Sequence, residues 1–288
     1  MSRFFGSGFF SALLVLRIPN RMIDVYRHPM LNVVSGENLE ILYQDDEIVA
    51  VDKPHGMLVH RSRIDVHATE FAVQKLRDQI GKPVFLIHRL DRPTSGVLLF
   101  ALNSDCARAL SVMFARKEVK KFYRAIVRGH TQDHGRWSEP LLEKLDAVSD
   151  TQARRDKPPQ DAITQFETIR RWEIPFSAGK YPNSRYSEVS IQPLTGRKHQ
   201  IRRHFNHMAH PVIGDTTHGD SRHNRLFRER LGVSRLLLVA HRLQFQHPVA
   251  DRQVDVCASL GIEYEKALEQ LERFSTTVKT ASDVPSSE

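Results

Sequence analysis

The chain has 288 residues, of which 40% are hydrophobic and 26% charged; this composition is ordinary for a folded domain and excludes disulfide-held miniproteins and coiled coils. No apolar run is long enough to cross a bilayer, so no membrane partner is expected. The 42 Lys and Arg residues outnumber the 34 Asp and Glu residues, and the resulting charge of +8 favours a polyanionic partner such as nucleic acid. Cys106 and Cys257 are far apart and outside any metal-binding spacing, which fits a reducing cytoplasm.

The two ends of the chain differ in composition from its middle. Residues 1–36 contain an apolar run from Phe9 to Leu16 without a cleavage motif, so we expect a leader that is disordered or outside the folded domain. Residues 275–288 are polar and aperiodic, which predicts a disordered tail. One folded domain is therefore expected over residues 37–274, and the charged segment 131–160 within it is interpreted as a mobile connection or insertion.

Strand and helix patterns are mixed along the folded part. Apolar and β-branched runs predict strands, which in chain order cover residues 39–43, 47–54, 84–88, 97–102, 121–129, 162–169, 186–193, 236–248 and 254–260. The continuous apolar run 97–102 is typical of a strand covered on both faces. Helical spacing predicts helices capped by Thr69 and Ser104, one that begins near Thr195, and a last one over residues 263–274. These patterns alone indicate a mixed α and β class and no more.

One turn between two predicted strands concentrates charge. The segment HRLDRPTSG, residues 88–96, places Asp91 between two arginines, which should keep this carboxylate ionised. Pro93 and Gly96 would fix the direction of the turn. A positioned, charged carboxylate can act as a nucleophile or a base. On this segment alone, an ordinary turn or N-cap aspartate with surface ion pairs is an equally good interpretation.

HRLDRPTSG resembles the signature of the RluA-type pseudouridine synthases. The resemblance extends in order through four further segments, namely DKPHG (52–56), KFYRAIVRG (121–129), PLTGRKHQIRRH (193–204) and HPVIGD (210–215). It implies an α/β (α+β) fold in which a mixed, largely antiparallel central sheet with flanking helices carries a basic catalytic cleft. It also implies an enzyme that isomerises a specific uridine of RNA to pseudouridine without a cofactor.

Four other stretches are similar to one subgroup of this family, the tRNA pseudouridine synthase C group, which acts on uridine 65 of tRNA. These stretches are LVHRS (58–62), RDQIG (77–81), GKYPNSRY (179–186) and THGDSRHNR (217–225). The similarity implies tRNA as the substrate, with uridine 65 as the target. A ribosomal RNA target and a catalytically silent RNA-binding module that keeps the scaffold stay open as alternatives.

The resemblance implies roles for individual residues. Asp91 matches the essential aspartate, which cleaves and re-forms the glycosidic bond by attack on base or sugar, or by abstraction of a ribose proton. Tyr123 matches the tyrosine that lies against the flipped base and helps to remove its C5 proton. Arg202 matches the basic residue that pairs with the aspartate, and Ile201 the apolar residue beside the base. Arg89 matches the arginine that fills the space left by the extruded uridine, which offsets part of the cost of flipping.

Other positions have a structural interpretation beside the functional one. Lys53 matches the lysine of the first family motif and is expected to be structural or RNA-facing. Arg197 and Arg203 belong to a basic segment expected to contact phosphates. Without the resemblance, Tyr123 would be a core aromatic, and Arg202 with Arg203 would form a solvated helix face or contact phosphate.

No metal site is expected, although histidines are frequent. His204, His207 and His210 follow one another at three-residue steps, each of which drifts about 60° around a helix. The chain also has no glycine-rich loop of the kind that binds nucleotides. A metal-dependent nuclease is therefore the weakest alternative, and we expect a monomer in the cytoplasm with no obligate protein partner.

The chain departs from the family at one place. Relatives usually carry Leu-His-Ala before the last strand, whereas this chain has Leu238, Val239 and Ala240, with a histidine only at His241. One family contact or the local packing is expected to differ there.

Overall fold

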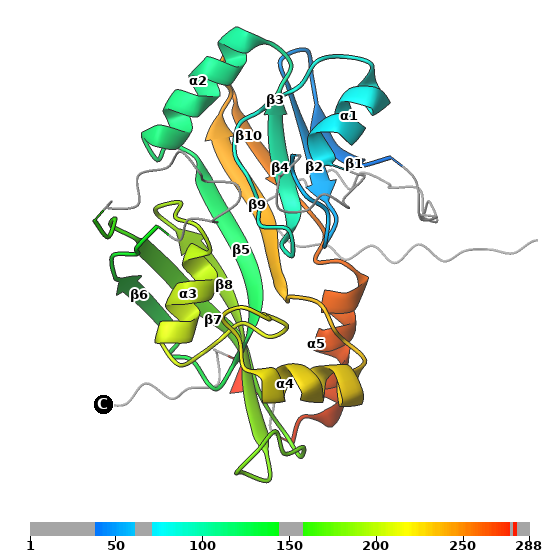
Figure 1. Cartoon of the computed structure of the whole chain (residues 1–288), viewed down its shortest axis with the longest axis vertical. Helices are drawn as coiled ribbons and strands as arrows, with labels where there is room; N and C mark the ends of the chain where they lie inside the picture. The colour runs from blue at the N-terminus through cyan, green and yellow to red at the C-terminus, as the bar shows by residue number, and fades with distance from the viewer. Residues whose placement is uncertain (1–37, 61–70, 144–157, 277–278, 281–288) are drawn as a thin grey trace, which may run out of the picture. The chain divides into compact units, whose positions relative to one another are not determined.

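A mixed, mostly antiparallel sheet of eleven strands is the framework of the part of the chain that the computed structural model describes, which is residues 38–60, 71–143, 158–276 and 279–280 (Figure 1). The expected leader, residues 1–36, lies outside the described residues, as does most of the expected tail. No helix in the described part is long and apolar enough to cross a membrane.

The strands occur in the order β1-β2-β4-β9-β5-β8-β7-β11, while β3, β10 and β6 pair with β4, β9 and β7. Among the strands of the described ranges only β4 and β9 pair in parallel, and the sheet is not closed. The strand bounds are β1 Glu40–Gln44, β2 Ile48–Lys53, β3 Phe85–Leu86, β4 Ser95–Ala101, β5 Lys120–Arg128, β6 His134–Ser138, β7 Ile163–Ile174, β8 Ser184–Pro193, β9 Leu238–Gln246, β10 Gln253–Cys257 and β11 Lys279–Thr280. The predicted fold class, a mixed and largely antiparallel sheet with flanking helices, is confirmed.

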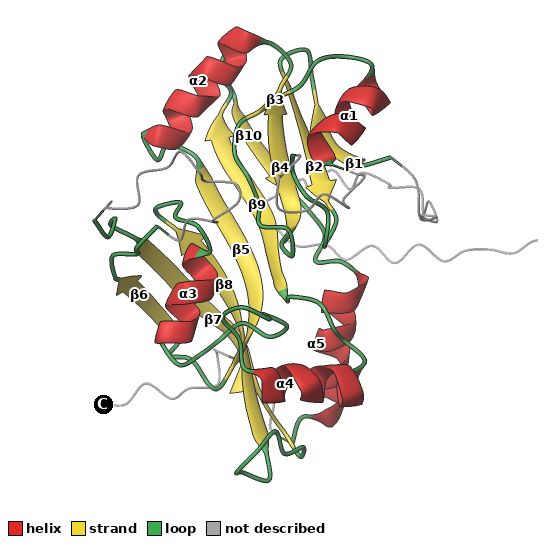
Figure 2. Ribbon diagram, in the orientation of Figure 1, coloured by secondary structure: helices red, strands yellow, loops and turns green. Residues whose placement is uncertain are grey.

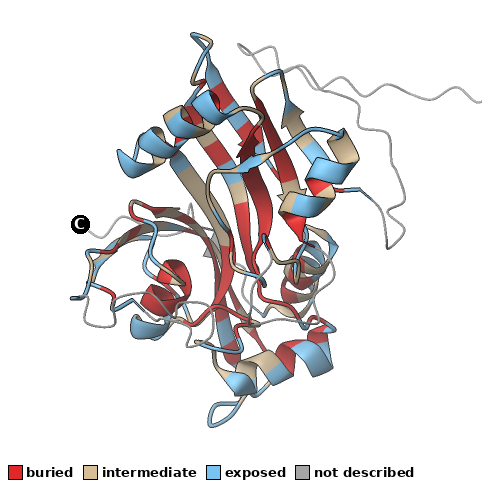
Figure 3. Ribbon diagram, turned by 45° about the horizontal axis from the view of Figure 1, so that its top comes forward, coloured by how far each residue is buried: buried red, intermediate tan, exposed pale blue. Residues whose placement is uncertain are grey.

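Helices cover both faces of this sheet (Figure 2). They are α1 Ala72–Ile80, α2 Ser104–Ala115, α3 Gln200–His207, α4 Ser221–Leu226, which continues into a π-helical turn at Phe227–Leu231, and α5 Ile262–Phe274. Along β4, Leu98 and Phe100 pack with α1, whereas Val97 and Leu99 pack with α2. Neighbouring side chains of a strand point to opposite faces. The prediction that this apolar run is covered on both sides is therefore confirmed, and Figure 3 shows β4 buried along its length.

The second half of the sheet is arranged in the same way. Ala125 and Val127 of β5 pack with Ile201 and Phe205 of α3, while Ile126 of β5 faces the cluster that contains α5. The helix that the sequence places near Thr195 thus covers the sheet half that carries β5, β8 and β7.

Several predicted boundaries are wrong. Helix α2 is capped by Asn103, whose side chain accepts a hydrogen bond from the Cys106 N–H, and not by Ser104. Helix α1 begins after Phe71, and Thr69 lies outside the described residues. Helix α3 begins only at Gln200, because the Thr195 hydroxyl donates to the Gln200 side chain at 2.6 Å and so holds the preceding loop. The strand expected over residues 84–88 shrinks to two residues.

Other elements were not predicted. Segment 131–160 contains β6, which pairs with the start of β7, so this part is not a mere connection; residues 144–157 lie outside the description. Helix α4 follows Asp220, whose side chain caps it. Beyond α5, the Thr276 N–H donates to the Glu173 carbonyl, and β11 pairs with β7. The division into leader, domain and tail stays a prediction.

Gly96 permits the one parallel pairing of the sheet. Its φ of +112° lies outside the range that L side chains adopt easily, and a Cβ placed there would lie 2.3 Å from the Ala240 carbonyl oxygen on β9. Gly96 faces Ala240 in the strand register. Because this contact follows directly on the Asp91 turn, it also fixes where that turn sits.

We expect Gly96→Ala to lower the free energy of unfolding by about 2 to 5 kcal/mol, since it combines overpacking with an unfavourable φ. Gly81→Ala is the matched control, because Gly81 has a φ of +65° but nothing within 4 Å of its would-be Cβ. That control should lose only about 1 to 2 kcal/mol. Equilibrium urea unfolding of both variants measures the difference, and equal losses would contradict the steric role of Gly96.

Candidate active site

The Asp91 turn is held to the loop that follows β2. The Thr94 N–H donates to the Asp91 carbonyl at 3.0 Å, which closes the turn. The Gly56 N–H donates to the Arg92 carbonyl and the Arg92 Nε donates back to the Gly56 carbonyl, each at 3.0 Å. The two segments that first drew attention in the sequence, 52–56 and 88–96, therefore form one unit.

Lys53 lies beneath this unit, fully buried at the end of β2. Its Nζ donates to three backbone carbonyls, those of Pro54 at 2.9 Å, Met57 at 2.8 Å and Arg92 at 3.2 Å. Burial lowers the pKa of Lys53 to about 7, although the charge of Asp91 opposes this shift. The ammonium group clamps the loop and the turn together and does not line the cavity described below.

Arg202 links the turn to α3. Its Nη1 donates to Asp91 Oδ2 at 3.1 Å, and its Nε and Nη2 donate to the two carboxylate oxygens of Asp215 at 2.6 and 2.8 Å. The side chains of Arg202 and Asp215 are 4% and 1% exposed, whereas that of Asp91 is 25% exposed. Arg202 thus forms a buried bidentate pair with Asp215, and its remaining nitrogen donates to the partly exposed carboxylate of Asp91.

Asp215 is held in turn by the loop after α3. Its Oδ1 accepts hydrogen bonds from the backbone N–H groups of Thr217 and His218, with N···O distances of 2.9 Å in both. Burial by itself raises the pKa of the Asp215 carboxyl, but the hydrogen bonds and charge of Arg202 outweigh it and lower the pKa below its ordinary value. Asp215 is the last residue of the HPVIGD motif, but nothing local to that motif shows its partner, so the sequence predicts no role for it.

A cavity of about 1470 Å³ opens over this pair. It is lined by the turn before β4, the start of β5 and the start of α3. The predicted residues that line it are Arg89, Asp91, Tyr123, Arg197, Ile201 and Arg202. Lysines from the start of β5 and from the loop before α3 join them, so most of the charged side chains that line the cavity are cations.

Tyr123 comes from β5, where it pairs with Ile191 of β8. Burial and the nearby charge of Asp91 raise the pKa of the Tyr123 hydroxyl above its ordinary value. This hydroxyl therefore carries its proton at neutral pH. The interpretation of Tyr123 as a core aromatic holds in part, because its ring also borders two apolar clusters.

Arg203 is not among the cavity-lining residues. It is 8% exposed, and its Nη1 donates to the Leu142 carbonyl at 2.8 Å. The alternative of a solvated helix face is wrong for both Arg202 and Arg203, because α3 is covered by the sheet on one side and by residues 139–142 on another. Residues 200–205 of this helix are all buried.

The histidines of α3 and the loop after it have separate partners. His204 bonds Thr164 and the Glu139 carbonyl, His207 pairs with the Glu139 carboxylate, and His210 bonds the Arg128 carbonyl. Within the described ranges no three residues of metal-ligating type gather into a site.

His241 bonds the Ala258 carbonyl through its Nδ1 at 2.8 Å, which joins β9 to the end of β10. Leu238 and Val239 are buried before it. His241 lies two places after Val239, the position that the family pattern gives to a histidine, and is thus used in strand packing.

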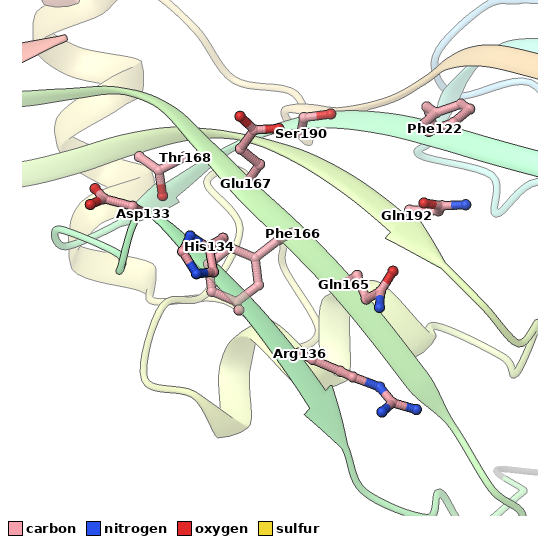
Figure 4. Close-up of a pocket in the computed structure, with 11 residues that line it drawn as sticks. Phe122, Asp133, His134, Arg136, Gln165, Phe166, Glu167, Thr168, Ser190 and Gln192 are labelled. Carbon is pink, nitrogen blue, oxygen red and sulfur yellow. The ribbon is translucent and has the colours of Figure 1, made fainter. Parts of the chain in front are cut away.

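A second, smaller cavity of about 650 Å³ lies on the polar side of β5, β8, β7 and β6 (Figure 4). Gln165, Gln192 and Arg136 project there beside Phe122. No buried charged pair comparable to that of Arg202 lines it in the described structure. The chemistry therefore concentrates in the cavity over Asp91.

Comparison with known proteins agrees with this arrangement. Residues 47–207 match the family model described as RNA pseudouridylate synthase. This range spans more than half of the chain and contains Asp91, Tyr123 and Arg202. The chain belongs to the RNA pseudouridylate synthase family, and the enzyme class and the RluA-type resemblance expected from the sequence are confirmed.

Similar proteins carry a more specific name. The chain is 49% identical over 244 residues to a protein of Vibrio vulnificus (strain CMCP6) named tRNA pseudouridine synthase C, covering 85% of this chain and 99% of that protein. It is 52% identical over 226 residues to the protein of that name from Pasteurella multocida (strain Pm70), covering 78% of this chain and 93% of the other.

Two solved human structures share the fold. Human RNA Pseudouridylate Synthase Domain Containing 1 aligns with a TM-score of 0.59 at 28% identity, over 80% of this chain and 86% of that one. Human RNA Pseudouridylate Synthase Domain Containing 4 aligns with a TM-score of 0.62 at 24% identity, over 84% and 94% of the two chains.

We expect Asp215→Asn to lower the free energy of unfolding by about 3 to 5 kcal/mol, because it leaves the buried Arg202 charge without its partner. Asp255→Asn is a matched control: Asp255 pairs with Arg242 through the same two guanidinium nitrogens, but these side chains are 38% and 43% exposed. The control should lose about 1 kcal/mol or less.

The effect of Asp215→Asn should also depend on pH. Because folding lowers the pKa of Asp215, its stabilisation is complete above the ordinary value of 3.8 and is lost as pH falls through the lower folded value. Urea unfolding of wild type and variant between pH 7 and the acid range measures this. If the difference in the free energy of unfolding between wild type and Asp215→Asn stayed constant through the acid range, the lowered pKa of Asp215 would be contradicted.

Proposed function

We propose that this enzyme isomerises uridine 65 of tRNA to pseudouridine. The observation that carries the chemistry is the hydrogen bonding of Arg202. Buried Asp215 binds two of its nitrogens, and the third donates to Asp91 at the edge of a cation-lined cavity. The names of the relatives that are about half identical over most of the chain support tRNA as the substrate. The stretches shared with their subgroup support position 65.

Asp91 is the residue that starts the reaction. Its carboxylate reaches the cavity while Arg202 holds Oδ2, so it can act on a nucleotide flipped into the cavity. The N1–C1′ bond of uridine breaks, the uracil turns, and a C5–C1′ bond forms. The C5 proton is then lost and N1 gains a proton, so the product is an isomer and no oxidant, metal or cofactor takes part.

Tyr123 and Ile201 hold the flipped base. Both line the cavity beside Asp91. An aromatic ring stacked on a base contributes about 1 to 3 kcal/mol. Since the Tyr123 hydroxyl is protonated in the resting enzyme, it accepts the C5 proton only together with loss of its own, or it orients a water that does so.

The cations of the cavity rim hold the RNA backbone. Arg89 and Arg197 are exposed there; we assign the first to the gap left by the flipped uridine and the second to a phosphate. Lys53 and Arg203 are assigned to holding the site together and not to RNA, because both are buried on backbone carbonyls. One chain supplies all of these groups, which supports a monomer that acts on tRNA without an obligate protein partner. We assign this reaction to the cytoplasm, where the expected substrate is found.

The first test is to incubate the purified protein with unmodified tRNA transcripts and to map pseudouridine by a modification-specific chemical stop. We expect one new signal at position 65, lost when that position is cytidine. Asp91→Ala should lower turnover by at least about a hundredfold while RNA binding is kept, because binding rests on phosphate contacts.

Asp105→Ala is the control variant for this test, because the Asp105 side chain is 87% exposed on α2. It should modify tRNA at the wild-type rate. A signal on ribosomal RNA alone would overturn the tRNA assignment, and ordinary turnover by Asp91→Ala would overturn the mechanism.

Tyr123→Phe separates the ring of Tyr123 from its hydroxyl. Stacking is retained, so KM for tRNA should change by less than about threefold, whereas kcat should fall by about a hundredfold or more if the hydroxyl moves the C5 proton. Steady-state kinetics on the tRNA transcript provide both constants. An unchanged kcat would restrict Tyr123 to stacking.

A further inference from the structure

His199 occupies an unusual position at the start of α3. It is the N-cap residue, yet its φ of 55° is left-handed and its side chain makes no capping hydrogen bond. Ser, Thr, Asp and Asn are the usual N-caps because their side chains bond the first free N–H groups. A left-handed conformation is uncommon for any residue with a side chain. The His199 carbonyl accepts the Arg203 N–H of the first helical turn, but the side chain does nothing for the helix in return for the strained backbone.

The imidazole of His199 instead lies between Asp91 and His218. Its Nε2 is 3.8 Å from Asp91 Oδ2, and its Nδ1 is 3.0 Å from His218 Nε2. The two rings meet edge to face, with centroids 5.2 Å apart. The backbone of His218 is held by Asp215 Oδ1 at its N–H and by the Asn206 side chain at its carbonyl.

This geometry selects a tautomer. One proton lies between His199 Nδ1 and His218 Nε2, so one of these nitrogens donates and the other accepts. If His199 donated, its Nε2 would turn a lone pair toward the Asp91 carboxylate. If His218 donates, His199 carries its proton on Nε2, where it faces a negative oxygen, and this second arrangement is the favourable one.

We propose that His199 is a positioning residue for Asp91, in which the Nε2–H binds the same oxygen that Arg202 holds and leaves Oδ1 to the nucleotide. His218 sets the tautomer, and the gap of 3.8 Å closes to a hydrogen bond when RNA fills the cavity, as active-site hydrogen bonds commonly tighten in the complex. The inference rests on the role proposed above for Asp91.

Burial, more than the charges around it, keeps His199 neutral near pH 7. Burial lowers its pKa, Asp91 and Asp215 oppose this, and Arg202 with Lys198 add to it. Protonation at lower pH would put a full positive charge beside Asp91 and make the carboxylate a weaker nucleophile and base. It would also require His218 to accept instead of donate. The rate of the chemical step should therefore fall on the acid side.

The test uses single-turnover rates on tRNA with two substitutions. His199→Gly suits the left-handed backbone, so its melting temperature should equal or exceed that of wild type, while the rate falls by about ten- to a hundredfold and tRNA affinity changes less than about twofold. His199→Gln keeps an amide donor at the reach of Nε2 and should recover to within about fivefold of wild type, without the acid-side fall that His199 causes.

The control is His207→Gln at the other end of α3. His207 pairs with Glu139 at the surface, and this variant should keep both the rate and the acid-side fall. A wild-type rate for His199→Gly, a His199→Gln variant as slow as His199→Gly, or an unchanged acid-side fall in His199→Gln would each overturn the proposal.

A measurement without substrate separates this inference from the proposed function. Proton–nitrogen spectra of the full chain labelled at histidine, assigned with His199→Gln, should show His199 protonated at Nε2. Asp91→Asn should shift that resonance, and His218→Ala should change the tautomer. Observation of the Nδ1–H form in the wild type would overturn the proposal whether or not tRNA is modified, whereas inactive wild type with the expected spectra would overturn only the function.

Discussion

The buried pair of Arg202 and Asp215 is the interaction on which the candidate site depends. A guanidinium keeps its charge in proteins, and its removal from water costs several kcal/mol unless a partner neutralises it. Asp215 does so with both oxygens, and backbone N–H groups of the following loop hold Asp215. Two of the three guanidinium nitrogens are thereby fixed, so the third can meet Asp91 from one direction only.

The sheet brings the two halves of the site together. Arg202 stands on α3, which covers the half of the sheet that carries β5, β8 and β7, whereas Asp91 precedes β4 in the other half. Strand β9 lies between β4 and β5, and its close approach to Gly96 determines how near the halves come. Lys53 binds a carbonyl of the Asp91 turn. Both members of the Asp91–Arg202 ion pair are therefore held in place by buried, hydrogen-bonded residues, Asp91 by Lys53 and Arg202 by Asp215.

The charges of the cavity serve two physical needs at once. An excess of cations attracts a polyanion and raises its association rate, and one of these cations, Arg202, orients the carboxylate that the proposed chemistry requires. The neutral His199 supplies a directed donor in this environment without a further charge. Arg203 and His204 follow Arg202 on the helix. Their side chains bond the Leu142 carbonyl and Thr164, which keeps α3 in place.

The sequence by itself determined the class of fold and the residues worth testing. Strand periodicity and apolar runs marked β2, β4, β5, β7, β8 and β9, because burial on one or both faces leaves a direct record in residue order. The family motifs marked Asp91, Tyr123 and Arg202. Caps and short elements such as β6 and α4 escaped, because a few polar residues carry little periodic signal.

Only the tertiary structure decided which charges are buried and which partners they have. Asp91 and Arg202 are 111 residues apart in the chain, and the roles of Asp215 and His199 appear only when the loop after α3 folds back on the helix start. The same fold covers Arg203 on a helix whose pattern predicted a solvated face. The reason is physical: periodicity reports the local environment of a segment, whereas the desolvation and pairing of a charge depend on segments distant in sequence.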